Sequence, residues 1–457
     1  MRYQMKKFKS KFIIGIVFIC IIAFFFGSVF YRVYRAKRYY DYGAESGKSS
    51  ESAQDDNAAI SSDISSYGWQ KKYPFGEKYK FILAEEKNNA PVSVESSSPA
   101  KASKYLSVVN KFKDSIEYYT TMLLPGRMKY IEANALFNKT VGMKIVSGTD
   151  SVVVMKNGYL TFENSASSDA TKQAESVKWF SDIMKEKEID FIYFQYPTKE
   201  KEGDGMLPEG VTDGANITAD NLVERLKKSG VNCSDLRASL AQKDSDWYSN
   251  FFKTDHHWKP ETGVWAAGQI VSTLNSDFGY KLDSDIGNLE SYNIDVYEKY
   301  CFGSQGKIVT LTFADPEDIS IIYPKKKTNI TVQYNTDAPS TGRFENVIFN
   351  KSYLNNTDYY NYSAYASYLN GNKALTQITN HDCKNDKKIL IIGDSYNKCV
   401  APYLSQTFES TTLLDRRYFD GSVIDYIDRT DPDIVIIAYT PTLIGGVESH
   451  TSTFNFE

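Results

Sequence analysis

The chain has 457 residues, a length typical of roughly three domains, and its 53 basic and 57 acidic residues give a net charge of -4. This balance excludes a strongly basic nucleic-acid-binding protein, so we expect no nucleic-acid partner. Hydrophobic residues make up 42% of the chain and aromatic residues 14%, enough to bury a core, whereas the five cysteines are too few for a disulfide scaffold.

The first 40 residues hold nine basic residues and no acidic one, which leaves 44 basic against 57 acidic residues in the rest, a net charge of -13. Within them, residues 12–31 (FIIGIVFICIIAFFFGSVFY) form a 20-residue run without charge. As a helix it would measure about 30 Å, the thickness of a bilayer core. A cleaved signal peptide or a buried soluble helix are the alternatives. The run is long for a signal peptide, and basic residues follow it without an A-x-A pattern.

We therefore predict a cell-membrane protein with a single transmembrane signal anchor at 12–31 and a basic cytoplasmic tail at 1–11. Residues 32–100 follow as a linker that is acidic and serine-rich over 41–66, a composition that cannot bury enough apolar surface to order itself. Residues 101–457 are the predicted extracytoplasmic domain.

The elements expected in this domain begin with a helical pattern over 101–119. A hairpin follows at 151–162, where Asn157-Gly158 is a strong turn signal. We then expect the following elements: a helix at 171–187, a buried strand at 189–197, a helix at 219–230, a strand from 231, and a helix starting near Pro260.

Near the C-terminus, strands at 387–395, 411–419 and 431–440 alternate with helices at 396–409 and 420–429. This alternation predicts an α/β fold with a parallel sheet and helices on both faces, in the manner of flavodoxin. Residues 280–385 are rich in Tyr, Asn and Thr, and we expect them to form an insertion beside the sheet.

Gly393-Asp394-Ser395 lies at the carboxyl end of a predicted strand, where sites form in α/β sheets. Ser395 would open the next helix, whose free backbone N–H groups stabilise an oxyanion. The alternative is that Asp394 or Ser395 merely caps that helix.

A serine nucleophile needs a base, and the chain has only four histidines. In an extended TDHHW segment, Asp255 and His257 lie at i and i+2 and point to the same side, so the carboxylate would orient the imidazole while His256 points away. These residues would otherwise be ordinary polar loop residues or ligands of a metal ion; adjacent histidines point in different directions, and we expect no metal. His450, with Glu448 before it, is a competing base.

TDHHW, followed by KPETGVWAA and a later GDSY, resembles the DHHW family of Gram-positive bacteria. That family is similar to the SGNH-type domains of the alginate O-acetylation proteins. The likeness covers most of 101–457, including the hairpin at VVVMKNGYLTF and the strand end at FQYPTKEK.

The resemblance implies a catalytic triad in which Asp255 orients, His257 is the base and Ser395 is the nucleophile. LLDRRYF is similar to an Asp-x-Arg-Tyr segment of the related group, which makes Arg417 a candidate oxyanion or substrate donor, with Arg416 as the alternative. Tyr439, at the end of the last strand, is a further candidate.

The implied function is O-acetyl transfer to a cell-surface or secreted polysaccharide through an acetyl-serine, with no cofactor. The related systems imply a membrane-bound O-acyltransferase of the MBOAT type as the donor partner. An acetyl esterase with the same triad is the first alternative, and a catalytically inactive polysaccharide-binding envelope protein is the second. A disulfide between Cys383 and Cys399 stays open.

Overall fold

The computed structural model describes part of the chain, namely residues 127–146, 151–164, 169–243, 246–445 and 453–457. The chain divides into two units, Met1–Asn134 and Ala135–Glu457, and the description below concerns the second. The expected signal anchor, linker and first helical segment lie outside the described residues. Among the residues that are described, no helix is long and apolar enough to cross a membrane.

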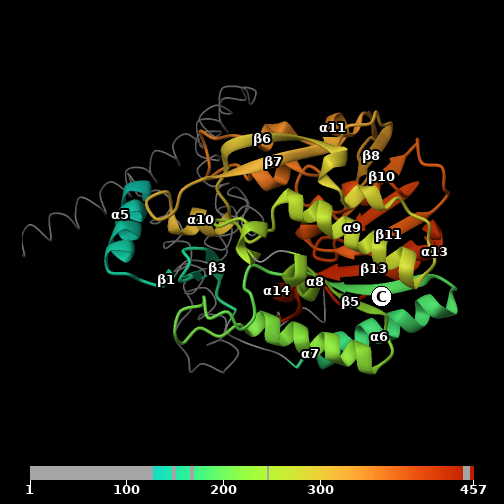
Figure 1. Ribbon diagram of the computed structural model, residues 1–457, viewed down its shortest axis with the longest axis horizontal. Helices are drawn as coiled ribbons and strands as arrows, with labels where there is room; N and C mark the ends of the chain where they lie inside the picture. The colour runs from blue at the N-terminus through green and yellow to red at the C-terminus, as the bar shows by residue number, and fades with distance from the viewer. Residues whose placement is uncertain (1–126, 147–150, 165–168, 244–245, 446–452) are drawn as a thin grey trace, which may run out of the picture. The chain divides into compact units, whose positions relative to one another are not determined.

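The second unit is built on an eight-stranded mixed sheet in the order β5-β4-β13-β11-β12-β10-β8-β9 (Figure 1). The strands from β5 to β12 are parallel to their neighbours, and β10, β8 and β9 continue the sheet in antiparallel pairing. Their bounds are β4 (Asp190–Gln195), β5 (Cys233–Asp235), β8 (Ile330–Tyr334), β9 (Ser340–Gly342), β10 (Leu375–Asn380), β11 (Lys388–Gly393), β12 (Ser410–Leu414) and β13 (Ile434–Tyr439).

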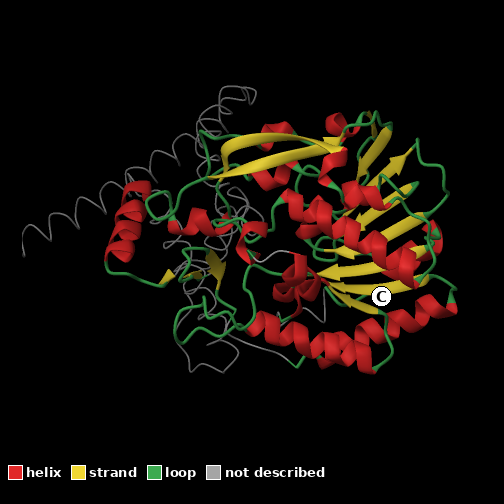
Figure 2. Cartoon of the chain, in the orientation of Figure 1, coloured by secondary structure: helices red, strands yellow, loops and turns green. Residues whose placement is uncertain are grey.

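Helices cover both faces of this sheet, as predicted (Figure 2). The reason lies in the continuous apolar strands, whose successive side chains point to opposite faces. In β11, Ile389 and Ile391 belong to one hydrophobic core together with α9, whereas Leu390 and Ile392 belong to a second core together with α6, α7 and α13.

The α-helices are α5 (Arg127–Thr140), α6 (Thr171–Glu186), α7 (Gly214–Lys228), α8 (Leu236–Lys243), α9 (Pro260–Asp277), α10 (Ser304–Val309), α11 (Phe344–Val347), α12 (Ala401–Leu404), α13 (Val423–Thr430) and α14 (Pro441–Ile444). The 3₁₀ helices are η2 (Trp247–Asn250), η3 (Ser284–Gly287), η4 (Leu289–Ser291), η5 (Lys351–Tyr353), η6 (Ala364–Ser367) and η7 (Ser395–Cys399). A small sheet holds β1 (Ile145–Val146) and the predicted hairpin, β2 (Val152–Val154) and β3 (Leu160–Phe162).

The sheet is mixed rather than parallel, which corrects the first expectation. Strands β8, β9 and β10 come from the segment expected to lie beside the sheet, and they extend the sheet itself. β10 alternates half-buried and buried residues, the pattern of an antiparallel strand covered on one face. The same segment also contributes a separate antiparallel pair, β6 (Tyr292–Cys301) and β7 (Glu317–Pro324).

The prediction of a single helix over 396–409 is also wrong. Residues Ser395–Cys399 are a 3₁₀ helix and only Ala401–Leu404 are α-helical. Val400 lies between them, as the residue that ends the 3₁₀ helix and precedes α12. The strand expected to reach residue 419 ends at Leu414, because the carbonyl of Asp415 accepts the amides of Tyr418 and Phe419 in a turn.

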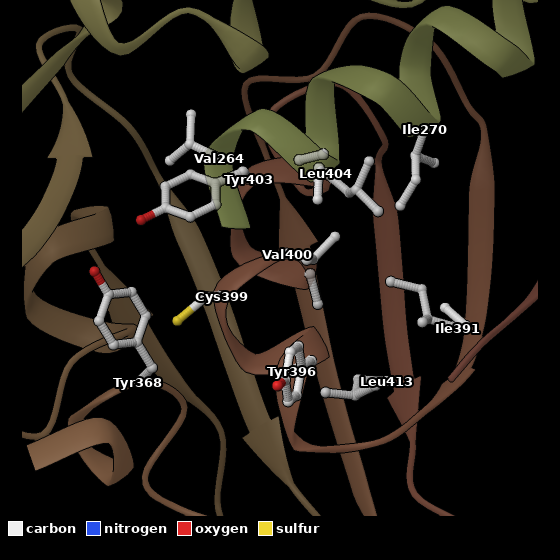
Figure 3. Packing of buried hydrophobic residues seen from close by; sticks show 14 of the residues in the cluster. Val264, Ile270, Tyr368, Ile391, Tyr396, Cys399, Val400, Tyr403, Leu404 and Leu413 are labelled. Carbon is white, nitrogen blue, oxygen red and sulfur yellow. The ribbon is translucent and has the colours of Figure 1, made fainter. Parts of the chain in front are cut away.

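Helix α9 packs closely on the segment after β11. A Cβ added to Gly263 would lie 2.2 Å from the carbonyl oxygen of Cys399, so only glycine allows this approach. Figure 3 shows Val264 and Ile270 of α9 facing Val400 and Leu404. The helix that follows the two histidines is thereby fixed against the segment that follows Ser395.

Candidate active site

The carboxyl end of β11 is tied to the ends of its neighbours by buried polar groups. The Asp394 carboxylate accepts the amide of Thr440 at 3.0 Å and its hydroxyl at 2.7 Å, just beyond β13. Asn397 donates to the carbonyl of Ala438 at 3.0 Å and accepts the Tyr196 hydroxyl at 2.7 Å. A Cβ on Gly393 would lie 2.2 Å from the Asn397 amide nitrogen, so glycine is required there.

The segment carrying the two histidines is a bend held from several sides. Trp258 is fully buried and donates its indole N–H to the carbonyl of Tyr396 at 3.3 Å. The Glu317 carboxylate accepts the Thr254 amide and hydroxyl, both at 2.7 Å. The Ser304 amide, at the start of α10, donates to Asp255 Oδ2 at 3.0 Å. Asp255 is therefore oriented by groups outside its own segment.

The structure brings Asp255, His257 and Ser395 into one hydrogen-bonded chain. His257 Nδ1 lies 2.5 Å from Asp255 Oδ1, and His257 Nε2 lies 2.7 Å from Ser395 Oγ. All three are buried, with at most 7% of each residue exposed. The His257 amide also donates to Asp255 Oδ1 at 3.0 Å. The pairing is thus made across a local bend instead of along an extended strand.

Two rings pack on the His257 imidazole. The Tyr365 ring stacks on it with centroids 3.8 Å apart and planes 14° apart, and the His256 ring also lies 3.8 Å away. Two rings this close do not fit on one face, so the imidazole lies between them.

This burial sets the charges of the pair. Burial, reinforced by the neighbouring His256, lowers the pKa of His257 well below its ordinary value. Burial opposes ionisation of Asp255 as well, but the two histidines hold the pKa of that carboxyl well below its usual range. A neutral imidazole therefore donates Nδ1–H to a carboxylate and presents Nε2 as an acceptor to the serine hydroxyl.

His256 does not point away as expected. Its ring packs beside His257, and its Nδ1 lies 2.9 Å from Ser304 Oγ. Asp255, His256 and His257 offer metal-ligating atoms within 4.8 Å of one another. Both His257 nitrogens already have protein partners.

The three other candidate residues, Arg417, Arg416 and Tyr439, have different hydrogen-bond partners. Arg417 binds the Asp415 carboxylate through Nε at 2.9 Å and Nη2 at 2.6 Å. Arg416 turns to backbone carbonyls, donating to those of Asn455, Phe419 and Gly421. The Tyr439 side chain lies in the core on the α6 side of the sheet.

The Tyr439 hydroxyl donates to the Thr453 carbonyl at 2.9 Å. The structure therefore does not aim Tyr439 at Ser395.

His450 lies outside the described residues. Cys383 and Cys399 are both free thiols, so they are not joined in a disulfide.

Two further residues belong to the site and were missed in the sequence. Tyr365 stacks on His257 from η6, in a region whose sequence carries no motif. Lys398 is only 6% exposed and lines a small depression with Ser395. Its spacing of three from Ser395, which places both on one helical face, was the signal available in the sequence.

Comparisons with known proteins confirm the resemblance. The family model "SGNH hydrolase-like domain, acetyltransferase AlgX" matches residues 154–285. The structure of Bacillus cereus PatB1 is 19% identical with a TM-score of 0.55, covering 68% of this chain and 99% of its own.

The structure of PatB1 with a sulfonyl adduct has a TM-score of 0.57 at 19% identity, covering 68% of this chain and 100% of its own. A DHHW family protein from Eubacterium siraeum is 20% identical with a TM-score of 0.52, covering 68% and 97%. At these identities the solved structures show a shared fold. No curated protein matches the chain at the sequence level.

Proposed function

We propose that this protein is an extracytoplasmic O-acetyltransferase that modifies a cell-surface or secreted polysaccharide through an acetyl-serine on Ser395. The observation that carries the proposal is the buried hydrogen-bonded chain from Asp255 through His257 to Ser395. The AlgX acetyltransferase family model over 154–285 supports the choice of acetyl transfer. The apolar run at 12–31 supports a membrane tether, beside a membrane-bound O-acyltransferase that supplies the acetyl group.

The chemistry follows from the two hydrogen bonds. His257 Nε2 takes the Ser395 hydroxyl proton as Oγ bonds to the acetyl carbonyl carbon, and the carbonyl electron pair moves onto oxygen. The pair returns as the donor's leaving group departs with the proton from His257. A sugar hydroxyl then attacks the acetyl-serine, gives its proton to His257, and leaves as the acetate ester while Ser395 regains its proton. Asp255 stabilises the imidazolium that forms in each half. The Ser395 N–H is the proposed oxyanion donor, and Arg417 is a proposed substrate donor.

The experiment uses the full chain in detergent with an activated acetyl ester and a mixture of oligosaccharides. We expect mass spectrometry to find an acetyl group on Ser395 and acetylated sugar as product. The Ser395→Ala variant should form neither, with a loss in kcat on the order of 10⁶-fold. A Ser395→Ala variant that retains the wild-type rate would overturn the proposal.

The second candidate is an acetyl esterase with the same residues and water as acceptor. The transferase and the esterase differ in whether the acetyl group of the acetyl-enzyme goes to sugar or to water. Accumulation of free acetate at the same rate with and without oligosaccharide would favour the esterase. Absence of any acetyl-enzyme or turnover would favour a polysaccharide-binding protein without catalysis.

A further inference from the structure

We infer that the ammonium group of Lys398 is a catalytic residue that stabilises the oxyanion formed when Ser395 Oγ attacks the acetyl carbonyl. This inference rests on the proposed function and adds to it a residue that the sequence motifs do not contain.

Lys398 shares a helical face with the nucleophile. Ser395 and Lys398 are three residues apart in the 3₁₀ helix η7, and side chains at i and i+3 of a 3₁₀ helix are eclipsed. Both line the same depression, together with Asp394, Thr376 and Leu413. A carbonyl carbon bound to Ser395 Oγ would have its oxygen in or beside this depression.

The Lys398 side chain is largely buried, and among the described residues no carboxylate is bound to its ammonium group. Lys398 is 6% exposed, and within the described part of the chain no hydrogen bond or salt bridge to Nζ is formed. The centroid of the Tyr365 ring lies 4.9 Å from Nζ. That same ring stacks on His257, so Lys398 and the base both pack against Tyr365. A buried cation with free N–H donors is the group that a developing oxyanion requires.

The other cations near the serine are already engaged or more exposed. Arg417 has Nε and Nη2 committed to Asp415. Lys373 also lines the depression, but it is half-buried and its Nζ lies 5.7 Å from the Tyr334 ring. Of these cations, Lys398 is thus the largely buried one whose N–H groups are available to an oxyanion.

The step balances without a further reactant. As the bond between Ser395 Oγ and carbon forms, the carbonyl electron pair becomes an oxyanion that accepts a hydrogen bond from Nζ. No proton leaves Lys398, because the pair returns to the carbonyl when the leaving group departs. Lys398 must be charged for this role, and burial lowers its pKa to about 8. Activity should therefore decrease as pH rises through about 8.

Titratable and charged groups from each neighbouring element face this ammonium and bear on its titration. On or next to η7 they are Asp394 and Cys399, and from the other elements they are Asp255, Tyr365, Lys373, Asp415 and Arg417.

The test is a pH–rate profile of acetyl-ester turnover by the full chain and its variants, with the Ser395→Ala rate subtracted. Lys398→Met should lower kcat about 10²-fold with little change in KM, and its remaining activity should show no decrease through pH 8. Lys398→Arg should keep more activity than Lys398→Met, and its alkaline decrease should vanish because a guanidinium stays charged.

The matched control is Lys199→Met. Lys199 is 1% exposed and burial lowers its pKa to about 8 too, but its Nζ donates to the Leu160 carbonyl and to Gln305 Oε1. This variant should lose stability and keep the alkaline decrease.

The possible results distinguish a failure of the Lys398 inference from a failure of the proposed function. An unchanged decrease near pH 8 in Lys398→Arg, or a Lys398→Met variant with wild-type kcat, overturns the role of Lys398 and leaves the proposed function intact. A wild-type chain that forms no acetyl-serine overturns both.

Discussion

At the scale of single residues, the imidazole of His257 is the centre of the site. It touches a carboxylate, a hydroxyl and two rings within about 4 Å. Because burial and His256 both disfavour its protonation, the free protein holds the base in its neutral, proton-accepting form.

The first prediction at this scale concerns the acidic limb of the pH profile. His257 acts as a base only while neutral, and its pKa is lowered well below the ordinary value. Activity is present above that lowered pKa and is lost as pH falls through it. We therefore expect kcat/KM for acetyl-ester turnover to stay constant as pH decreases through about 6.5, the ordinary value of histidine, and to fall only under more acidic conditions.

The second prediction separates the adjacent histidines. His257→Gln should abolish turnover, because no other group bonds the Ser395 hydroxyl among the described residues. His256→Gln should keep plateau activity within about tenfold and move the acidic limb to higher pH, since it removes a neighbour that lowers the pKa of His257. The reverse pattern of activity would assign the base to His256.

At the scale of elements, the site depends on how closely α9 approaches η7. Gly263→Ala would drive a methyl group against the Cys399 carbonyl, displacing the segment that carries Ser395 from the helix that follows His257. We expect a loss of about 1–3 kcal/mol in the free energy of unfolding. We also expect at least a tenfold lower kcat, because small shifts of a nucleophile are costly.

Gly268→Ala is the matched control on the same helix. Its Cβ would lie 2.7 Å from the Cα of Gly287, on a contact that involves neither η7 nor the histidine segment. Urea unfolding should show a similar loss of stability, whereas kcat of the folded fraction should stay near wild type. Equal effects on kcat in both variants would show that general loosening, and not the placement of Ser395, controls the rate.

Element types were predictable where a pattern is strong and local. The Asn157-Gly158 hairpin and the apolar strands β4, β11 and β13 follow from turn chemistry and hydrophobic runs. The helix expected after Ser395 was wrong in type and length, because Ser395–Cys399 form a 3₁₀ helix and only Ala401–Leu404 are α-helical. The place of β10 in the sheet was not predictable, since its alternating pattern does not say that it pairs with β12 and β8.

At the scale of the whole molecule, the sequence places the nucleophile and the base 138 residues apart, and the fold joins them at 2.7 Å. The motifs identified both ends of that contact. Tyr365 and Ser304 were not foreseeable, because they come from the segment 280–385 and reach the histidines only through tertiary packing. The segment that looked like an accessory insertion therefore completes both the sheet and the site.

The buried ammonium of Lys398 has a consequence for the evolution of stability. A pKa lowered from 10.5 to about 8 means that the charged lysine costs the folded state roughly 3 kcal/mol at neutral pH. Lys398→Met should therefore raise the melting temperature at pH 7 while lowering turnover, whereas Lys199→Met should lower it by leaving carbonyls without a donor. Thermal unfolding of the two variants measures this directly. A lineage selected for heat resistance alone would discard Lys398, so its retention would record selection for catalysis against stability.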